Sequence, residues 1–136
     1  MLYNNRMDKT DKKILFIDDD KFLLDMYILK FGKAGYEAKA ADSTEGALKL
    51  LREGYVPDVL LIDIVMPGMD GLDLVSLIRK EKLAPLATII MLTNQGASDD
   101  VVRARKFNVD GYIVKATTIP SEVLSEVEKI YNSKKA

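Results

Sequence analysis

Short apolar runs are the feature that most constrains how this chain folds. Four of them, at 14–17, 59–62, 86–92 and 112–114, are almost purely apolar, whereas a fifth, at 36–41, places charged residues between apolar ones. Unbroken apolar runs of this length are typical of strands buried on both faces of a parallel sheet, and alternation is typical of a half-exposed strand. The sequence therefore predicts four buried strands and one edge strand.

The segments between these runs have a helical repeat, with apolar residues recurring every three or four positions. The predicted inward faces are Leu24, Tyr27, Ile28 and Phe31; Ala47, Leu48 and Leu51; Leu74, Leu77 and Ile78; Val101, Val102 and Arg105; and Val123, Val127, Ile130 and Tyr131. Strands that alternate with helices of crossover length favour right-handed βαβ units. We therefore predict a three-layer (βα)5 fold of the α/β class with a five-stranded parallel sheet.

Composition excludes several classes of function. The chain has 136 residues, enough for one domain, and its 20 basic and 21 acidic side chains leave no excess of positive charge for direct nucleic-acid binding. It contains neither Cys nor His, which excludes disulfides and thiolate or imidazole ligands. No apolar run is long enough to span a membrane.

The domain boundaries follow from the same patterns. We expect residues 1–12 to form a flexible leader, residues 13–132 to form one domain and residues 133–136 to form a C-terminal tail. The leader mixes acids with bases and lacks the long apolar stretch of a secretion signal, so we expect a cytoplasmic protein.

Polar side chains end four of the predicted strands. Asp18 and Asp19 follow the first run, Asp63 follows 59–62, Thr93 follows 86–92 and Lys115 follows 112–114. Because the carboxyl ends of parallel strands share one edge, where α/β folds bind ligands, these side chains are predicted to form one site. Three clustered carboxylates repel one another, and an oxygen-only ligand set favours Mg²⁺, with Lys115 supplying further positive charge.

Such a site suits phosphoryl transfer. A carboxylate can attack phosphorus and form an aspartyl phosphate, while the metal, an ammonium and a hydroxyl stabilise the transferring oxygens. This chemistry requires positioning and positive charge more than it requires a histidine base. Asp20 is interpreted as a helix N-cap, and Pro67, Gly68 and Gly71 as loop-forming residues.

Four motifs resemble the receiver domain of two-component response regulators, over about residues 13–131. They are Ile14-Leu-Phe-Ile-Asp-Asp-Asp20, Leu60-Leu-Ile-Asp-Ile-Val-Met-Pro-Gly-Met-Asp-Gly71, Met91-Leu-Thr93 and Gly111-Tyr-Ile-Val-Lys115. The resemblance, to the stand-alone CheY-like type, implies a flavodoxin-like sheet with strand order 2-1-3-4-5. It also implies a phosphoacceptor signalling domain that catalyses only its own phosphorylation and dephosphorylation.

The resemblance also implies the role of each site residue. Asp63 would be the phosphoacceptor, and Asp18, Asp19 and Asp63 would hold Mg²⁺ together with the backbone carbonyl of Val65. Thr93 would bond the phosphoryl group, Lys115 would pair with it, and Thr93 and Tyr112 would form the switch. The donor would be a sensor histidine kinase or a histidine phosphotransfer protein. The chain departs from the family at Ala116, where proline is usual, and at Asn94, where a small residue is usual.

Two other functions fit parts of the sequence. A haloacid dehalogenase-type aspartyl-phosphate phosphatase uses similar groups, but its Asp-x-Asp-x-Thr pattern is incomplete in Asp18-Asp-Asp-Lys-Phe22. A phosphorylation-independent adaptor with the same fold is the second alternative. Only 21 residues follow Lys115, so we expect no attached output domain and an effect exerted on a separate protein.

The first predicted helix carries a second apolar stripe, formed by Phe22, Met26 and Leu29 on the side away from its predicted core face. A solvated helix does not need such a stripe. Two interpretations stay open: the stripe receives the helices of a phosphodonor, or the leader or a neighbouring copy of the chain covers it.

Overall fold

The structure is a computed structural model that describes residues 12–93, 98–115 and 118–135. Its centre is a five-stranded parallel sheet in the order β2-β1-β3-β4-β5. The strands are β1 (Lys13–Ile17), β2 (Glu37–Ala41), β3 (Val59–Asp63), β4 (Thr88–Thr93) and β5 (Gly111–Val114). The predicted strand count, parallel arrangement and strand order are therefore confirmed.

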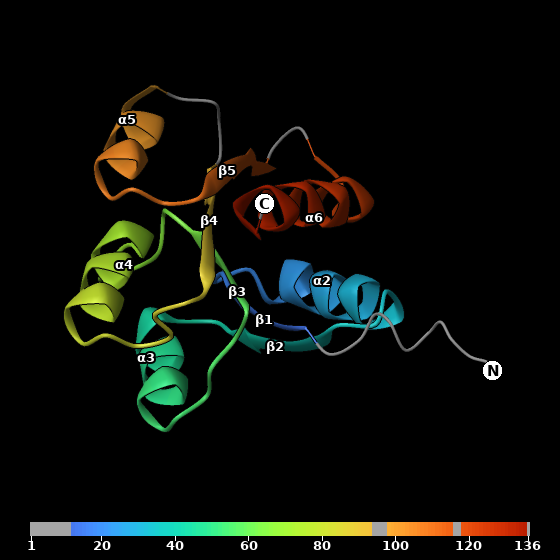
Figure 1. The fold of residues 1–136 in the computed structure, drawn as a ribbon, viewed down its shortest axis with the longest axis horizontal. Helices are drawn as coiled ribbons and strands as arrows, with labels where there is room; N and C mark the ends of the chain where they lie inside the picture. The colour runs from blue at the N-terminus through green and yellow to red at the C-terminus, as the bar shows by residue number, and fades with distance from the viewer. Residues whose placement is uncertain (1–11, 94–97, 116–117, 136) are drawn as a thin grey trace.

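Five helices cover the sheet. They are α2 (Lys21–Lys33), α3 (Thr44–Arg52), α4 (Gly71–Lys80), α5 (Ser98–Lys106) and α6 (Pro120–Lys135). Helices α2 and α6 lie on one face, and α3, α4 and α5 lie on the other, which gives three layers (Figure 1). This arrangement confirms the predicted (βα)5 fold.

The neighbouring strands β1 and β3 contribute to the core on both faces of the sheet. Leu15, Ile17, Leu60 and Ile62 pack on the α3–α4 side, and their sequence neighbours Ile14, Phe16, Val59 and Leu61 pack on the α2–α6 side. All eight are at most 1% exposed, as expected for strands buried on both faces. By contrast, in the part of the chain that the structure describes β2 pairs only with β1, and it has exposed residues, as predicted for an edge strand.

Side-chain caps fix the N-termini of α2, α3 and α4, which follow β1, β2 and β3 in the chain. The side chain of Asp20 accepts a hydrogen bond from Leu23 N–H at 3.1 Å, and Ser43 Oγ accepts one from Gly46 N–H at 3.0 Å. Asp70 caps α4 in the same way, through Asp73 N–H at 2.9 Å. The N-cap role predicted for Asp20 is confirmed.

Two predicted elements differ from the structure. The run beginning at Leu86 enters the sheet only at Thr88, and Leu86 is 90% exposed because a turn at Ala84, with φ +40°, precedes the strand. In α5 the fully buried residue is Ala104, whereas the predicted inward residues Val102 and Arg105 are exposed. This helix is rich in charged residues and buries a small side chain rather than a broad apolar face.

The C-terminal boundary differs from the prediction. Residues 133–135, expected as a tail, continue α6. The leader apart from Lys12, the family departure at Asn94 and the family departure at Ala116 lie outside the described residues. Among the described residues, no helix combines the length and the apolar character needed to cross a membrane.

Candidate functional site

Three carboxylates meet at the carboxyl ends of β1 and β3, as predicted. These strands are neighbours in the sheet, and Ile17 pairs with Ile62 immediately before Asp18 and Asp63. Asp18, Asp19 and Asp63 each offer an oxygen within 4.8 Å of the others. Asp18 and Asp63 are buried, and Asp19 is exposed, so the cluster is open to solvent on one side.

Lys115 joins the cluster from the end of β5, two strands away from β3. Its Nζ lies 2.8 Å from Oδ2 of Asp18 and 3.0 Å from Oδ2 of Asp63. The ammonium donates a hydrogen bond to Asp63, whereas its contact with Asp18 is an ion pair without hydrogen-bond geometry. The structure therefore brings the predicted lysine together with two of the three predicted acids.

Backbone amides hold the other oxygen of each buried acid. The N–H of Asp20 donates to Asp18 Oδ1 at 2.9 Å, and the N–H of Val65 donates to Asp63 Oδ1 at 3.2 Å. Each carboxylate is thus fixed by the chain two residues beyond it and turns its second oxygen toward Lys115. Sequence reasoning missed both amides, because a backbone donor leaves no signal in residue type.

Burial and neighbouring charges set the protonation of the site. Burial raises the pKa of Asp63, the hydrogen bond from Lys115 lowers it and the charge of Asp18 raises it, which leaves the pKa at about 6. Burial alone lowers the pKa of Lys115, but the close carboxylates of Asp18 and Asp63 outweigh it and raise that pKa to about 12. At neutral pH Asp63 is therefore mainly a carboxylate, and it lies beside a stable ammonium.

The loop after β3 is shaped by a close backbone approach at Gly71. Its N–H donates to the carbonyl of Ile64 at 2.8 Å, and a Cβ atom on Gly71 would lie 2.2 Å from the carbonyl oxygen of Asp63. Only glycine fits this position, because the obstacle is backbone rather than a flexible side chain. Gly71 therefore does more than form a loop, because it allows α4 to begin directly against the backbone of Asp63.

The donor set fits a hard divalent cation. Asp18 Oδ2 is buried and accepts no hydrogen bond in the described part of the chain, so this oxygen retains capacity for a ligand. One ammonium leaves three carboxylates with excess negative charge, and every side-chain ligand in the cluster is oxygen. Mg²⁺ prefers such ligands and keeps several waters, which the exposed side at Asp19 can accommodate.

The remaining predicted residues lie on the strands beyond β3. Thr93 ends β4 and is fully buried, and it pairs with Val114, which immediately precedes Lys115. Tyr112 lies on β5, partly buried against the α3–α4–α5 side of the core, and its hydroxyl accepts a hydrogen bond from Arg105 Nε at 3.1 Å. Sequence reasoning predicted a site residue at Tyr112 but not that α5 would bind its hydroxyl through Arg105.

The arrangement of these residues matches a known family. The family model described as response regulator receiver domain matches residues 14–128. The chain belongs to this family. Response regulator receiver domains are signalling domains of two-component systems, so the predicted family and signalling class are confirmed.

Two curated proteins are similar in sequence to this chain over about 120 residues. Transcriptional regulatory protein ResD of Bacillus subtilis is 38% identical over 128 residues, which cover 91% of this chain and 50% of ResD. Phosphate regulon transcriptional regulatory protein PhoB of Pseudomonas aeruginosa is 29% identical over 119 residues, which cover 88% of this chain and 51% of PhoB. The chain thus spans about half the length of the curated relatives it matches.

Solved receiver structures share the fold over almost their whole length. A CheY-like response regulator receiver domain protein from Methanospirillum hungatei has a TM-score of 0.81 at 26% identity. The match covers 93% of this chain and 98% of that protein. The predicted flavodoxin-like, CheY-like fold is therefore confirmed.

Proposed function

We propose that this receiver domain accepts a phosphoryl group on Asp63 in a Mg²⁺-dependent reaction. The donor would be a phosphohistidine of a sensor histidine kinase or a histidine phosphotransfer protein in the cytoplasm, and the phosphorylated domain would signal by protein–protein interaction. The observation that best supports this function is the buried Asp63 carboxylate, with one oxygen bound by Val65 N–H and the other by Lys115. A carboxylate oriented in this way, beside a cation, is suited to attack phosphorus.

The chain's own residues provide most of the chemistry. An oxygen of Asp63 attacks phosphorus and forms a C–O–P linkage, the P–N bond of the donor breaks, and its electron pair stays on the imidazole nitrogen. Lys115 then pairs with the new phosphoryl oxygens instead of the free carboxylate, and the Thr93 hydroxyl donates a hydrogen bond to them. Asp18, Asp19, Asp63 and the Val65 carbonyl would hold Mg²⁺, which, when bound, neutralises charge on the phosphoryl oxygens.

Signalling would use the strands beyond the acceptor. Phosphate on Asp63 draws Thr93 inward, and Tyr112 on the neighbouring strand changes its position in response. The Arg105–Tyr112 hydrogen bond of 3.1 Å is the contact that this change would break, and it connects the strand to α5. Phosphorylation would thus shift the equilibrium between two conformations of the surface formed by α5, β5 and α6.

The phosphodonor would dock on the outer face of α2. Phe22, Met26 and Leu29 are 75%, 36% and 61% exposed, so the predicted stripe is on the surface. Helix α2 begins at Lys21, directly after the acids at Asp18 and Asp19, and this brings the stripe next to the site. An apolar stripe on a helix beside a reaction centre suits helices of a partner that must approach Asp63.

The function is tested with a small phosphodonor such as acetyl phosphate and Mg²⁺. A labile phosphoryl adduct that Asp63→Asn abolishes and Asp42→Asn retains supports the receiver, because Asp42 is an acid outside the cluster. Steady hydrolysis of phosphate esters would instead support a haloacid dehalogenase-type phosphatase. Failure of the native chain to react, with or without Mg²⁺, would support a phosphorylation-independent adaptor.

The docking surface is tested by comparing two kinds of donor. Replacing Phe22, Met26 and Leu29 together by Ala is expected to slow transfer from phosphorylated histidine kinases of the source organism and to leave the acetyl phosphate reaction unchanged. Val56→Ala with Leu86→Ala is the matched control, because both residues are exposed apolar side chains on other loops. Equal slowing with both donors would contradict docking on the stripe and indicate damage to the site.

A further inference from the structure

The outer edge of β2 has no partner strand among residues 12–93, 98–115 and 118–135. Within these ranges β2 pairs with β1 alone, in an unbroken register from Glu37 to Ala41. Glu37 N–H donates to Lys12 and the carbonyl of Ala41 accepts from Asp18, so the backbone groups of these two residues face β1. Because backbone groups alternate in direction along a strand, the N–H and C=O of Ala38 and Ala40 face outward.

This edge lacks the devices that usually prevent strand pairing. Proteins block open edges with Pro, bulges or lysines that extend across the edge. Here the strand has no bulge, and three of its five residues are alanines. Lys39 lies over the Tyr55 ring in the loop before β3, with its Nζ 5.0 Å from the ring centre, and this exposed side chain must turn away from the ring to pair with an acid on an incoming strand.

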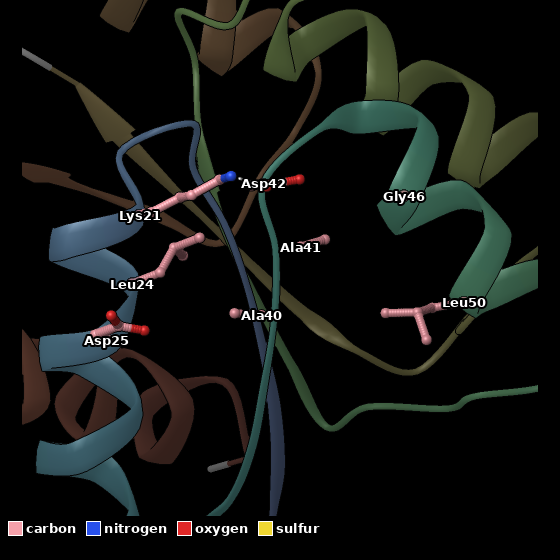
Figure 2. Close-up of a pocket in the computed structure, with 8 residues that line it drawn as sticks. All are labelled: Lys21, Leu24, Asp25, Ala40, Ala41, Asp42, Gly46 and Leu50. Carbon is pink, nitrogen blue, oxygen red and sulfur yellow. Dashed lines mark ion pairs between the residues drawn. The ribbon is translucent and has the colours of Figure 1, made fainter.

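A hollow beside the strand leaves room for an incoming chain. Its volume is about 460 Å³, and Figure 2 shows Ala40 and Ala41 of β2 between α2 and α3. The walls come from both helices and from the end of β2; the residues are Lys21, Leu24, Asp25, Asp42, Gly46 and Leu50. Small side chains on the strand and space on both sides of it allow close approach of a second strand.

We propose that a second copy of this chain adds its β2 to this edge, antiparallel, around a two-fold axis at Ala38. In that register the Ala38 backbones of the two copies exchange hydrogen bonds, and Glu37 of each copy faces Lys39 of the other. Both side chains are exposed and opposite in charge, so the Glu-Ala-Lys order of β2 is complementary to itself. This complementarity favours a second copy over an unrelated peptide.

Other two-fold registers are less favourable. An axis at Lys39 would place the lysines of the two copies directly opposite each other, and like charges in that position are destabilising. An axis at Ala40 would place Lys39 opposite Ala41 and lose both charge pairs. The register at Ala38 also places Tyr36 of one copy opposite Ala40 of the other. The small side chain of Ala40 borders the hollow.

The dimer would be weak and would not involve the phosphoacceptor site. Two five-residue edges bury less surface than a stable complex needs, so we expect association only at high protein concentration. Strand β2 is one edge of the sheet, and Lys115 follows β5 at the other. The proposal therefore does not rest on the proposed function.

Cysteine pairing tests the register, because the native sequence has no cysteine. Glu37 and Lys39 of the two copies would form a non-hydrogen-bonded pair with Cα atoms about 4.5 Å apart, a separation that a disulfide spans. A mixture of Glu37→Cys and Lys39→Cys chains is expected to oxidise to the heterodimer about tenfold faster than either variant forms its homodimer. Equal rates, or no crosslinking in the mixture, would overturn the proposed register.

Charge exchange tests the same contact without a crosslink. In sedimentation experiments at high protein concentration, Glu37→Lys or Lys39→Glu alone is expected to abolish association, and the double exchange to restore it. Unchanged melting temperatures and unchanged acetyl phosphate reactivity in all three variants show that the fold and the site are intact. A native chain that stays monomeric at millimolar concentration would overturn the proposal, whether or not the edge binds a peptide of another protein.

Discussion

The ammonium of Lys115 lies 3.0 Å from Oδ2 of Asp63, although the two residues end strands that are separated by β4. The same nitrogen lies 2.8 Å from Asp18 Oδ2, so one side chain from β5 holds the two buried acids of β1 and β3. These two ion pairs connect β5, the strand of Tyr112, to Asp63. A phosphoryl group on Asp63 must therefore rearrange the ion pairs of Lys115.

Removing the Lys115 ammonium should destabilise the chain in the absence of divalent cations. Lys115→Met leaves two buried carboxylates without their counter-charge, and such a loss costs about 3 kcal/mol in the free energy of unfolding. Urea denaturation in EDTA measures this cost, and millimolar Mg²⁺ should recover more stability in Lys115→Met than in the native chain. The control is Lys21→Met, whose 3.5 Å pair with Asp42 is exposed and should change stability by less than about 1 kcal/mol. Equal effects of the two substitutions would contradict the role of Lys115.

Magnesium should stabilise the native fold. A ligand that binds only the folded chain adds about 2.7 kcal/mol to the free energy of unfolding at one hundred times its dissociation constant. The melting temperature should therefore rise with Mg²⁺, and the rise should be much smaller in Asp63→Asn than in Asp42→Asn. An identical rise in both variants would place the cation elsewhere.

Replacing Gly71 by Ala should damage the acceptor strand. The new Cβ would lie 2.2 Å from the Asp63 carbonyl oxygen, so β3 or α4 must shift, at a cost of about 1–3 kcal/mol, and acetyl phosphate should react more slowly. Gly32→Ala in α2 is the matched control, because a Cβ there meets nothing within 4 Å. That substitution should stabilise the helix by about 0.5–1 kcal/mol. If Gly71→Ala were equally harmless, the close approach would not position Asp63.

Alkaline pH should weaken the native chain through Tyr27. Burial, together with the charge of Asp18, raises the pKa of Tyr27 from 10.0 to about 12. Between these pH values the unfolded chain loses the tyrosine proton and the folded chain keeps it, so the free energy of unfolding falls as pH rises through this range. Tyr27→Phe should reduce the slope of stability against pH in that range and leave the slope near pH 8 unchanged. An unaltered slope above pH 10 would show that Tyr27 does not contribute.

The sequence predicted the fold and the site where side-chain pattern determines structure. The apolar runs of β1 and β3 can only be buried on both faces, and Asp18 and Asp63 follow them at the edge that parallel strands share. The predicted Asp20 cap is another such case, because the side chain and the helix start are adjacent in the chain.

The contacts that sequence reasoning missed depend on backbone or on distant elements. Val65 N–H donates a hydrogen bond to Asp63 Oδ1, and the backbone of Asp63 lies too close to Gly71 for any side chain there. Both contacts follow from the path of the backbone and not from a residue pattern. The turn at Ala84 keeps Leu86 out of β4 despite its apolar side chain. In α5 the helical repeat predicted Val102 as a core residue, but Val102 is 48% exposed and the residue that faces the core is Ala104.

Locating the phosphoryl group on the chain tests whether Asp63 is the phosphoacceptor. After reaction with acetyl phosphate and Mg²⁺, borohydride reduces an aspartyl phosphate to homoserine, which peptide mass spectrometry identifies. We expect homoserine at position 63 in the native chain and none when Mg²⁺ is replaced by EDTA. Homoserine at Asp18 or Asp19, or at no position, would contradict this expectation.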